Sequence, residues 1–146
     1  MIGETPFDSN NTSHFCDVQA RVYVADTDFS GIVYHARYLE FFERGRSEFL
    51  RDMGFNNDVL AAGSQGEKVF FVVRHMEIHF SKPAQIDNLL TIKTRVNRIQ
   101  GARFFMDQHI LHDKIMLVTA KVEIALINEE GKPRRLPNDF LSKVFA

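Results

Sequence analysis

Two aspartates separated by one residue, Asp26 and Asp28, are the first candidates for chemistry in this sequence. They lie in the stretch VADTDFSGIVYH, residues 24–35, where a pattern typical of a strand gives way to one typical of a helix. Three chemistries place aspartates at this spacing: a calcium-binding loop, an aspartate that accepts a phosphoryl group, and a carboxylate directed at a substrate carbonyl. The residues around the two aspartates indicate which of these three chemistries fits the sequence.

The first two chemistries conflict with the surrounding sequence. The twelfth position of an EF-hand loop supplies a bidentate carboxylate, but here that position is Arg37, and the pattern before the loop is that of a strand. A strand followed by DTDFS also resembles the first motif of haloacid-dehalogenase phosphatases. Those enzymes need a parallel sheet and further carboxylates for magnesium, whereas the later strands here follow one another directly.

The third chemistry uses the residues that follow the aspartates. Gly31 to His35 form or precede a helix N-terminus, where backbone N–H groups lack intrahelical partners and carry partial positive charge. Such groups stabilise the negative charge that develops on a carbonyl oxygen. Asp28 on the adjoining turn could then attack the carbonyl carbon, or accept a proton from a water that does so. This chemistry needs no metal and no cofactor.

Hydrophobic periodicity predicts the elements that position these residues. Residues 18–25 alternate as a half-buried strand, and residues 36–53 carry apolar side chains at three- and four-residue spacings, which predicts a long amphipathic helix ended by Gly54. Gly45 interrupts this helix, either because its backbone approaches the sheet or because an exposed glycine is tolerated there. Four further strands are predicted in VFFVVRHMEIHF, LLTIKTRVNR, ARFFMDQHILH and IMLVTAKVEIALI.

One helix and five strands in this order predict an α+β protein. A long helix would lie across an antiparallel sheet of about five strands. The 146 residues suit a single domain spanning residues 1–146, of which residues 1–16 are expected to be flexible. Because one helix covers only one face of the sheet, the other face or an edge is expected to bind a second copy of the chain.

Composition excludes several functional classes. A net charge of −1 offers no field to attract nucleic acid, and no apolar stretch is long enough to span a bilayer. The N-terminal residues show no export signal and Cys16 is the single cysteine, so a cytoplasmic protein is expected. Cys16 is not expected to act as a nucleophile. The histidines are dispersed and predict no metal site.

The segment RVYVADTDFSGIVYHARYLEFFERGRSEFL, residues 21–50, strongly resembles the opening motif of the YbgC-like acyl-CoA thioesterases. These form the Tol-Pal-associated branch of the 4-hydroxybenzoyl-CoA thioesterase family. FVVRHMEIHFSKPA and RLPNDFLSKV resemble further segments of that family, so the resemblance covers nearly the whole chain after residue 18. It implies the hotdog fold, a long central helix wrapped by an antiparallel sheet, and hydrolysis of an acyl-coenzyme A to free acid and coenzyme A.

The resemblance also implies roles for individual residues. Asp28 would be the catalytic carboxylate, as nucleophile or as general base. His35 would bind the thioester oxygen through its backbone N–H, and its side chain would line the same site. Asp26 is interpreted as holding the turn. Relatives often have a second aromatic residue after Tyr23, whereas this chain has Val24.

Substrate binding is expected from two further groups of residues. Those near the motif are Tyr23, Gly31, Val33 and Tyr34. Basic residues near the expected groove are candidates for contacts with the coenzyme A phosphates: Arg74, Lys82 and Arg103.

The same resemblance implies a homodimer or homotetramer in which two subunits form each active-site cleft. It also implies partners from the Tol-Pal system or from lipid metabolism, which would bring the protein to the inner membrane. Two alternatives stay open. One is a thioester dehydratase of the same fold that uses His35 and Glu43, against which the D-T-D motif argues; the other is an acyl-CoA-binding or scaffold protein.

Overall fold

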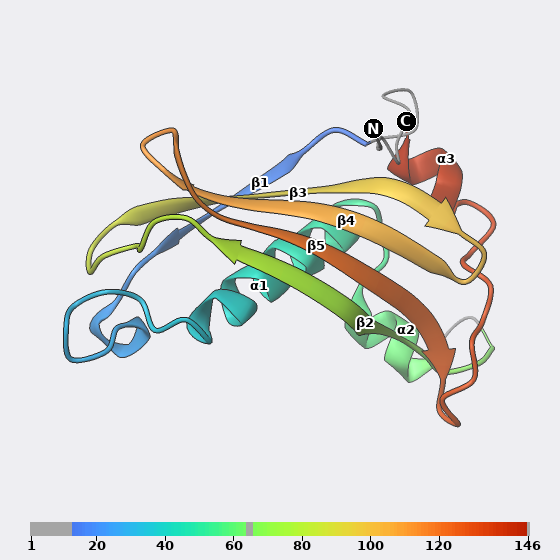
Figure 1. Ribbon diagram of the computed structural model, residues 1–146. Coiled ribbons are helices and arrows are strands. Elements are labelled where there is room, and N and C mark those ends of the chain that lie inside the picture. Colours follow the sequence, from blue (N-terminus) through green and yellow to red (C-terminus); the bar gives the residue numbers. More distant parts are fainter. Residues whose placement is uncertain (1–12, 64–65, 146) are drawn as a thin grey trace.

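The computed structural model describes residues 13–63 and 66–145 (Figure 1). One antiparallel sheet is formed by five strands: β1 (Cys16–Arg21), β2 (Val69–Phe80), β3 (Leu89–Gln100), β4 (Arg103–His112) and β5 (Ile115–Asn128). Their order is β1-β3-β4-β5-β2, so β1 and β2 are the edges. The long helix α1 (Arg37–Asp52) lies across one face of the sheet. This is the predicted α+β hotdog architecture.

The N-terminal segment predicted to be flexible is only partly described. Residues 1–12 lie outside the described residues. Ser13 is buried: its N–H donates to the carbonyl of Val96 and its hydroxyl oxygen accepts the N–H of Val96, both at 2.8 Å. Strand β1 follows at Cys16. The described end of this segment is therefore attached to β3.

Helix α1 forms because its apolar side chains gather on one face. Its buried residues are Tyr38, Phe41, Phe42, Gly45, Phe49 and Leu50. Burying one large apolar side chain stabilises the fold by about 1.5–3 kcal/mol, so this face holds the helix on the sheet. The helix begins and ends within one residue of the predicted range, and Gly54 follows with a φ of +86°, as expected of a glycine that ends a helix.

Gly45 marks a close approach between α1 and the sheet. A Cβ atom at this position would lie 2.7 Å from Cγ2 of Ile92, 2.7 Å from Oγ1 of Thr94 and 3.0 Å from Nε2 of Gln108. Contacts this short do not occur between real Cβ atoms and their neighbours. Of the two explanations offered for this glycine, close backbone approach is therefore confirmed.

The buried side chain of Gln108 joins α1 to the middle of the sheet. Its Nε2 donates to the carbonyl of Phe42 at 2.8 Å and to Oγ1 of Thr94 at 2.9 Å. Its Oε1 accepts a hydrogen bond from Nη1 of Arg46 at 3.0 Å. Because buried polar groups are costly when left unpaired, these bonds fix the position of the helix on the sheet.

The first strand ends earlier than predicted. Alternation predicted a strand over 18–25, but β1 ends at Arg21, and Val24–Asp26 form a short 3-10 helix, η2. The carboxylate of Asp26 accepts the N–H of Tyr23 at 2.8 Å, which bends the chain away from the sheet. A local side-chain hydrogen bond thus overrides the alternating pattern.

Two short helices were not predicted. They are α2 (Asn57–Ala62) and α3 (Phe140–Val144). Neither is long enough to show a helical period in the sequence. Each is fixed by buried apolar residues, Leu60 in α2, and Phe140 and Val144 in α3.

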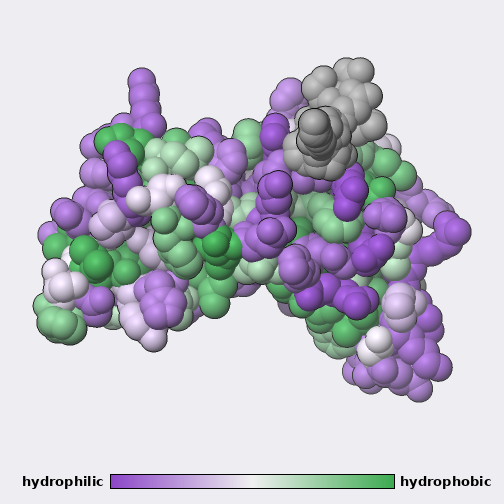
Figure 2. All heavy atoms as spheres, viewed as in Figure 1, coloured by the Kyte–Doolittle hydropathy of each residue, from purple (hydrophilic) through white to green (hydrophobic). Residues whose placement is uncertain are grey.

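The face of the sheet opposite α1, called here the outer face, carries a row of alternating charges. Arg95 on β3, Asp107 on β4, Lys121 on β5 and Glu77 on β2 are successive cross-strand partners. Nε of Arg95 lies 3.2 Å from Oδ2 of Asp107. Figure 2 shows hydrophilic residues over much of the sheet in this view. Opposite charges on neighbouring strands stabilise the sheet by about 0.2–1 kcal/mol per pair.

Strand β2 has one free edge within the described residues. It pairs with β5 on one side, and no described strand pairs with its other side. Phe70, Val73 and Phe80 on this strand are exposed apolar residues. A long edge of this kind is a ready surface for pairing with another strand.

None of the described helices combines the length and apolar character that crossing a bilayer requires.

Candidate active site

The segment that joins β1 to α1 folds back on itself as a tight turn. Thr27 and Val33 form an antiparallel bridge. The N–H of Asp28 donates to the carbonyl of Ile32 at 3.0 Å, and the N–H of Gly31 donates to the carbonyl of Asp28 at 3.1 Å. Gly31 has a φ of +83°, which residues with a side chain seldom adopt. Asp28 is therefore held at the start of the turn, opposite Ile32.

Asp26 holds the backbone around this turn. Its Oδ2 accepts the N–H of Tyr23 at 2.8 Å, its carbonyl accepts the N–H of Tyr34 at 3.1 Å, and Nε of Arg37 lies 3.5 Å from its Oδ1. The structural role interpreted for Asp26 is confirmed. Neither aspartate caps α1, because the N-cap residue is Ala36 and receives no side-chain hydrogen bond.

Among the residues that the structure describes, Ser30 is the one that binds the carboxylate of Asp28. Oδ1 of Asp28 accepts the Ser30 hydroxyl and also the Ser30 backbone N–H, the latter at 2.8 Å. The hydroxyl bond and the backbone bond favour the charged form and hold the pKa of Asp28 below its ordinary value. An ionised carboxylate of this kind can act as a nucleophile or as a base at neutral pH.

A cavity of about 350 Å³ lies at the N-terminal end of α1. It is lined by Ile32, Val33, His35, Tyr38, Phe80, Ser81, Lys82 and Pro83. The backbone N–H of His35 donates to no acceptor in residues 13–63 and 66–145. His35 directly precedes Ala36, the N-cap residue of α1, and an unpaired amide beside a helix N-terminus is suited to bind a carbonyl oxygen or an anion.

The loop between β2 and β3 forms the opposite wall of this cavity. The N–H of Val33 donates to the carbonyl of Ala84 at 2.9 Å, and the N–H of Ala84 donates to the phenol oxygen of Tyr38 at 2.9 Å. The rings of Tyr38 and Phe80 lie 5.7 Å apart. Burial raises the pKa of Tyr38, so the phenol stays neutral. The cavity wall is thus largely apolar, and one backbone and one side-chain hydrogen bond hold its parts together.

Three predicted site residues meet at this cavity, namely Val33, His35 and Lys82. Asp28 and Gly31 do not line it, but lie in the adjoining turn, which is hydrogen-bonded to the cavity wall. The structure therefore places these five residues in one region.

The two tyrosines of the motif lie at the surface of this region. The ring of Tyr34 is exposed and packs against the ring of His35, with centroids 4.6 Å apart. Tyr23 is also exposed, beside η2. Neither tyrosine lines the cavity. In Figure 2 hydrophobic residues gather at the end of the molecule where Figure 1 places the segment between β1 and α1.

The two predicted arginines lie elsewhere in the protomer. Arg74 is at a β-bulge in β2, and Arg103 opens β4, where it pairs with Ala125. The N–H of Lys82 binds the carbonyl of Leu117, eight residues from Ala125 along β5. At 3.4 Å per residue this separation is roughly 27 Å. Within one protomer, Arg103 and Lys82 do not share a site.

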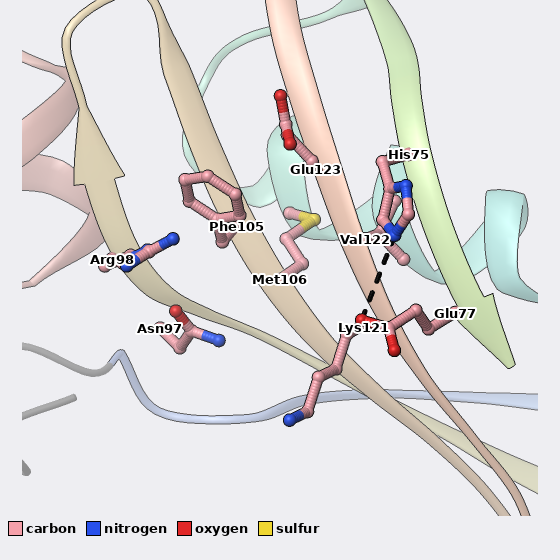
Figure 3. A pocket seen from close by; sticks show the side chains of 9 residues that line it. All are labelled: His75, Glu77, Asn97, Arg98, Phe105, Met106, Lys121, Val122 and Glu123. Carbon is pink, nitrogen blue, oxygen red and sulfur yellow. Dashed lines mark ion pairs between the residues drawn. The ribbon is translucent and has the colours of Figure 1, made fainter. Parts of the chain in front are cut away.

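A second, smaller hollow of about 170 Å³ lies on the outer face (Figure 3). Figure 3 shows Arg98 beside Phe105, with the guanidinium carbon 4.1 Å from the ring centroid, and Glu123 nearby, which is ion-paired to Arg103 at 2.9 Å. Charges of both signs surround the hollow. Its lining residues, all labelled in Figure 3, include none of the predicted site residues.

Sequence reasoning missed several residues of the site. These are Ser30 in the turn, and Ile32, Tyr38, Phe80, Ser81 and Pro83 at the cavity. Tyr38 belongs to the quoted motif, and Phe80 to Pro83 are neighbours of Lys82. Their positions in the sequence could therefore have identified both groups as candidates for the site. The contact of Ser30 with Asp28 depends on the geometry of the turn, which the sequence did not specify.

The structure also bears on the alternative chemistries. The haloacid-dehalogenase phosphatase hypothesis requires the ends of parallel strands, and an antiparallel sheet does not provide them. Glu43, the dehydratase candidate, lines a different hollow from His35 and accepts a hydrogen bond from Ser47. In the part of the chain that the structure describes, no three histidine, cysteine or acidic residues are grouped to hold a metal ion.

Comparisons with known proteins agree with this arrangement. The family model described as the thioesterase superfamily matches residues 30–119. The acyl-CoA thioesterase YbgC of Haemophilus influenzae is 38% identical over 120 residues, which are 82% of this chain and 86% of that protein. The acyl-CoA thioester hydrolase YbgC of Escherichia coli is 37% identical over 125 residues, 84% of this chain and 90% of that protein. A probable thioesterase from Bartonella henselae, solved by crystallography, is 84% identical with a TM-score of 0.82, covering 84% of this chain and 99% of that one.

Proposed function

This chain belongs to the YbgC acyl-CoA thioesterases of the thioesterase superfamily, and from this we propose that it hydrolyses acyl-CoA thioesters with Asp28 as the catalytic carboxylate. One observation carries the proposal. His35, whose N–H has no acceptor among the described residues, lines an apolar cavity whose wall is hydrogen-bonded to the turn that bears Asp28.

The cavity suggests how the substrate binds. The acyl group would lie against the apolar wall formed by Val33, Tyr38 and Phe80, and the thioester oxygen would accept the N–H of His35. Lys82 also lines the cavity, and its cation suits the phosphates of coenzyme A. Arg74 and Arg103 are too distant within one protomer to join it, so any contact they make with the same substrate would come from a second subunit.

Hydrolysis then requires an ionised carboxylate and a stabilised oxyanion. Asp28 either removes a proton from the attacking water or attacks the carbonyl carbon itself before water completes the reaction. A carbon–oxygen bond forms, the carbon–sulfur bond breaks, and the thiolate of coenzyme A leaves and gains a proton. One donor such as the His35 N–H is worth about 10²–10³ in turnover, because the bond strengthens as the oxygen becomes negative.

The variant Asp28→Asn tests this assignment. Turnover is expected to fall about 10²–10⁴-fold, because the amide can neither attack nor accept the proton, while the thermal unfolding temperature stays near that of the wild type. Release of free thiol is measured with a panel of aliphatic and aromatic acyl-CoAs. Asp58→Asn, an exposed aspartate on α2, is the matched control.

Two results would contradict the proposal. Hydrolysis by Asp28→Asn near the wild-type rate would remove Asp28 from the mechanism. Binding of acyl-CoAs by the wild type without thiol release would favour the acyl-CoA-binding or scaffold alternative.

The free edge of β2 supports a proposed homodimer. Two copies of β2 would pair across a two-fold axis and cover the exposed side chains of Phe70 and Val73. A partner beside the half-buried Asp28 and the exposed Phe29 would exclude water from the cleft, and exclusion of water strengthens the electrostatic stabilisation of the transition state. A homotetramer would be a dimer of such dimers.

The cellular setting is proposed from the resemblance alone. A YbgC-type enzyme would work in the cytoplasm, and association with Tol-Pal or lipid-metabolism proteins would bring it to the inner membrane. Co-purification of the tagged protein from fractionated cells tests both statements. Recovery of the protein without such partners would contradict the association.

A further inference from the structure

The turn around Asp28 offers little packing to fix its carboxylate. Phe29, the next residue, is fully exposed, and a Cβ atom built on Gly31 would meet nothing within 4 Å. A surface aspartate in such a setting would occupy several rotamers, and only some of them would direct an oxygen at the substrate. Misplacement of a reacting group by about 1 Å can cost about 10² in rate.

Hydrogen bonds from one residue take the place of packing. Ser30 donates both its backbone N–H and its hydroxyl to the same oxygen, Oδ1 of Asp28. Among the described residues, no donor contacts the other oxygen, Oδ2. The two oxygens of this carboxylate are therefore distinguished before any substrate binds.

We propose that Ser30 is a positioning residue that holds Oδ1 of Asp28 in the turn and leaves Oδ2 as the oxygen that meets the substrate or the attacking water. This inference rests on the proposed function of Asp28. Ser30 itself does not contact the substrate in this scheme.

The identity of residue 30 matters for a chemical reason. Glycine or alanine at this position would keep the backbone bond but would lose the hydroxyl bond, and a hydroxyl bound to a carboxylate forms one of the stronger hydrogen bonds. Both bonds also favour the ionised carboxylate, in agreement with the direction of its pKa shift. Loss of the hydroxyl would therefore loosen the carboxylate and make it easier to protonate.

Ser30→Ala tests the inference, with Ser30→Thr as the variant that keeps a hydroxyl. In Ser30→Ala, kcat is expected to fall about tenfold with KM little changed, since the reacting oxygen is less well placed. The acid limb of the kcat/KM profile is expected to move to higher pH. Ser30→Thr should recover most of the lost kcat. Ser142→Ala, in which an exposed serine on α3 loses its bond to the carbonyl of Asp139, should leave kcat and the acid limb unchanged.

The outcomes separate this inference from the proposed function. If Asp28→Asn loses activity but Ser30→Ala keeps both the wild-type kcat and the wild-type acid limb, the positioning role is wrong and the catalytic role of Asp28 stands. If Asp28→Asn stays active, the proposed mechanism itself fails. Should Ser30→Ala not fold by circular dichroism, Ser30→Cys replaces it, because a thiol is a weak donor of similar shape; wild-type kcat and acid limb in Ser30→Cys would equally overturn the inference.

Discussion

Asp26 and Asp28 show how two identical side chains, two residues apart, take different roles. Asp26 binds the Tyr23 N–H and lies beside Arg37, so both of its oxygens face groups of the protein. Within residues 13–63 and 66–145, the carboxylate of Asp28 binds Ser30 alone, through one oxygen. The difference lies in which neighbours the turn brings to each carboxylate, and composition alone does not reveal it.

The residues of the site were predictable to different degrees. Asp28, Val33 and His35 lie close together because they belong to one short motif, so sequence proximity already implied proximity in space. Arg74 and Arg103 were chosen from strands, and their distance from the cavity depends on register, which a single sequence did not supply. Cys16 was not expected to be a nucleophile; burial and a hydrogen bond to Asp52 raise the pKa of its thiol to about 11, which keeps it protonated.

The pH dependence of hydrolysis should report the lowered pKa of Asp28. We expect kcat/KM to stay constant as pH falls from neutral, because the carboxylate loses its charge only as pH approaches a pKa below the ordinary value of 3.8. The measurement is kcat/KM against pH, with circular dichroism confirming that the protein stays folded. An acid limb centred near neutral pH would contradict the assignment of the essential ionisation to Asp28.

Among the elements, the long ones were predictable and the short ones were not. Helix α1 and strands β2 to β5 each repeat their pattern over ten or more residues, and their ends agree closely with the predicted ranges. The 3-10 helix η2 and the helices α2 and α3 have three to six residues and show no period. What fixes them is tertiary contact, such as the packing of Phe140 against Phe104 with ring centroids 5.0 Å apart.

Helix α1 should be sensitive to any side chain at position 45. Gly45→Ala is expected to destabilise the protein by about 1–2 kcal/mol, because overpacking against Ile92 and Thr94 costs about 1–3 kcal/mol and the higher helix propensity of alanine recovers up to about 1 kcal/mol. Urea unfolding measures the change. Glu48→Ala, on the charged face of the same helix, should shift stability by no more than about 0.5 kcal/mol.

A stabilising effect of Gly45→Ala would contradict this account. It would mean that α1 can move away from the sheet without loss, and that the bonds of Gln108 do not fix its position. The comparison with Glu48→Ala shows whether an alanine in this helix is itself destabilising, so that a loss of stability confined to Gly45→Ala can be assigned to packing against the sheet.

At the scale of the whole molecule, the two faces of the sheet differ in what they leave uncovered. The inner face is covered by α1, and the outer face carries the row of alternating charges from Arg95 to Glu77. Among the described strands, the unpaired edges belong instead to β1 and β2, and β2 is the longer of the two, with its exposed Val73. The sequence predicted that one helix would leave part of the sheet open, but which strand lies at the edge depends on strand order, and local patterns do not encode that order.

Self-association should therefore depend on the edge of β2. In sedimentation experiments Val73→Lys is expected to shift the protein towards the monomer and to lower turnover, because a charge on an edge strand opposes pairing. Leu141→Lys, which replaces an exposed leucine on α3, should change neither. An unchanged sedimentation profile for Val73→Lys would place the contact between copies elsewhere.

The close approach at Gly45 has a consequence for reactivity at a distance. Gly45 lies eight residues, roughly 12 Å along the helix axis, from Arg37 at the start of α1, and His35 lies two residues before Arg37. A helix moves nearly as a rigid rod, so an extra methyl group that tilts its middle also displaces its first turn and the adjoining amide of His35. Catalytic efficiency in such variants would then decline through altered alignment, even though every group surrounding the scissile bond keeps its chemical identity.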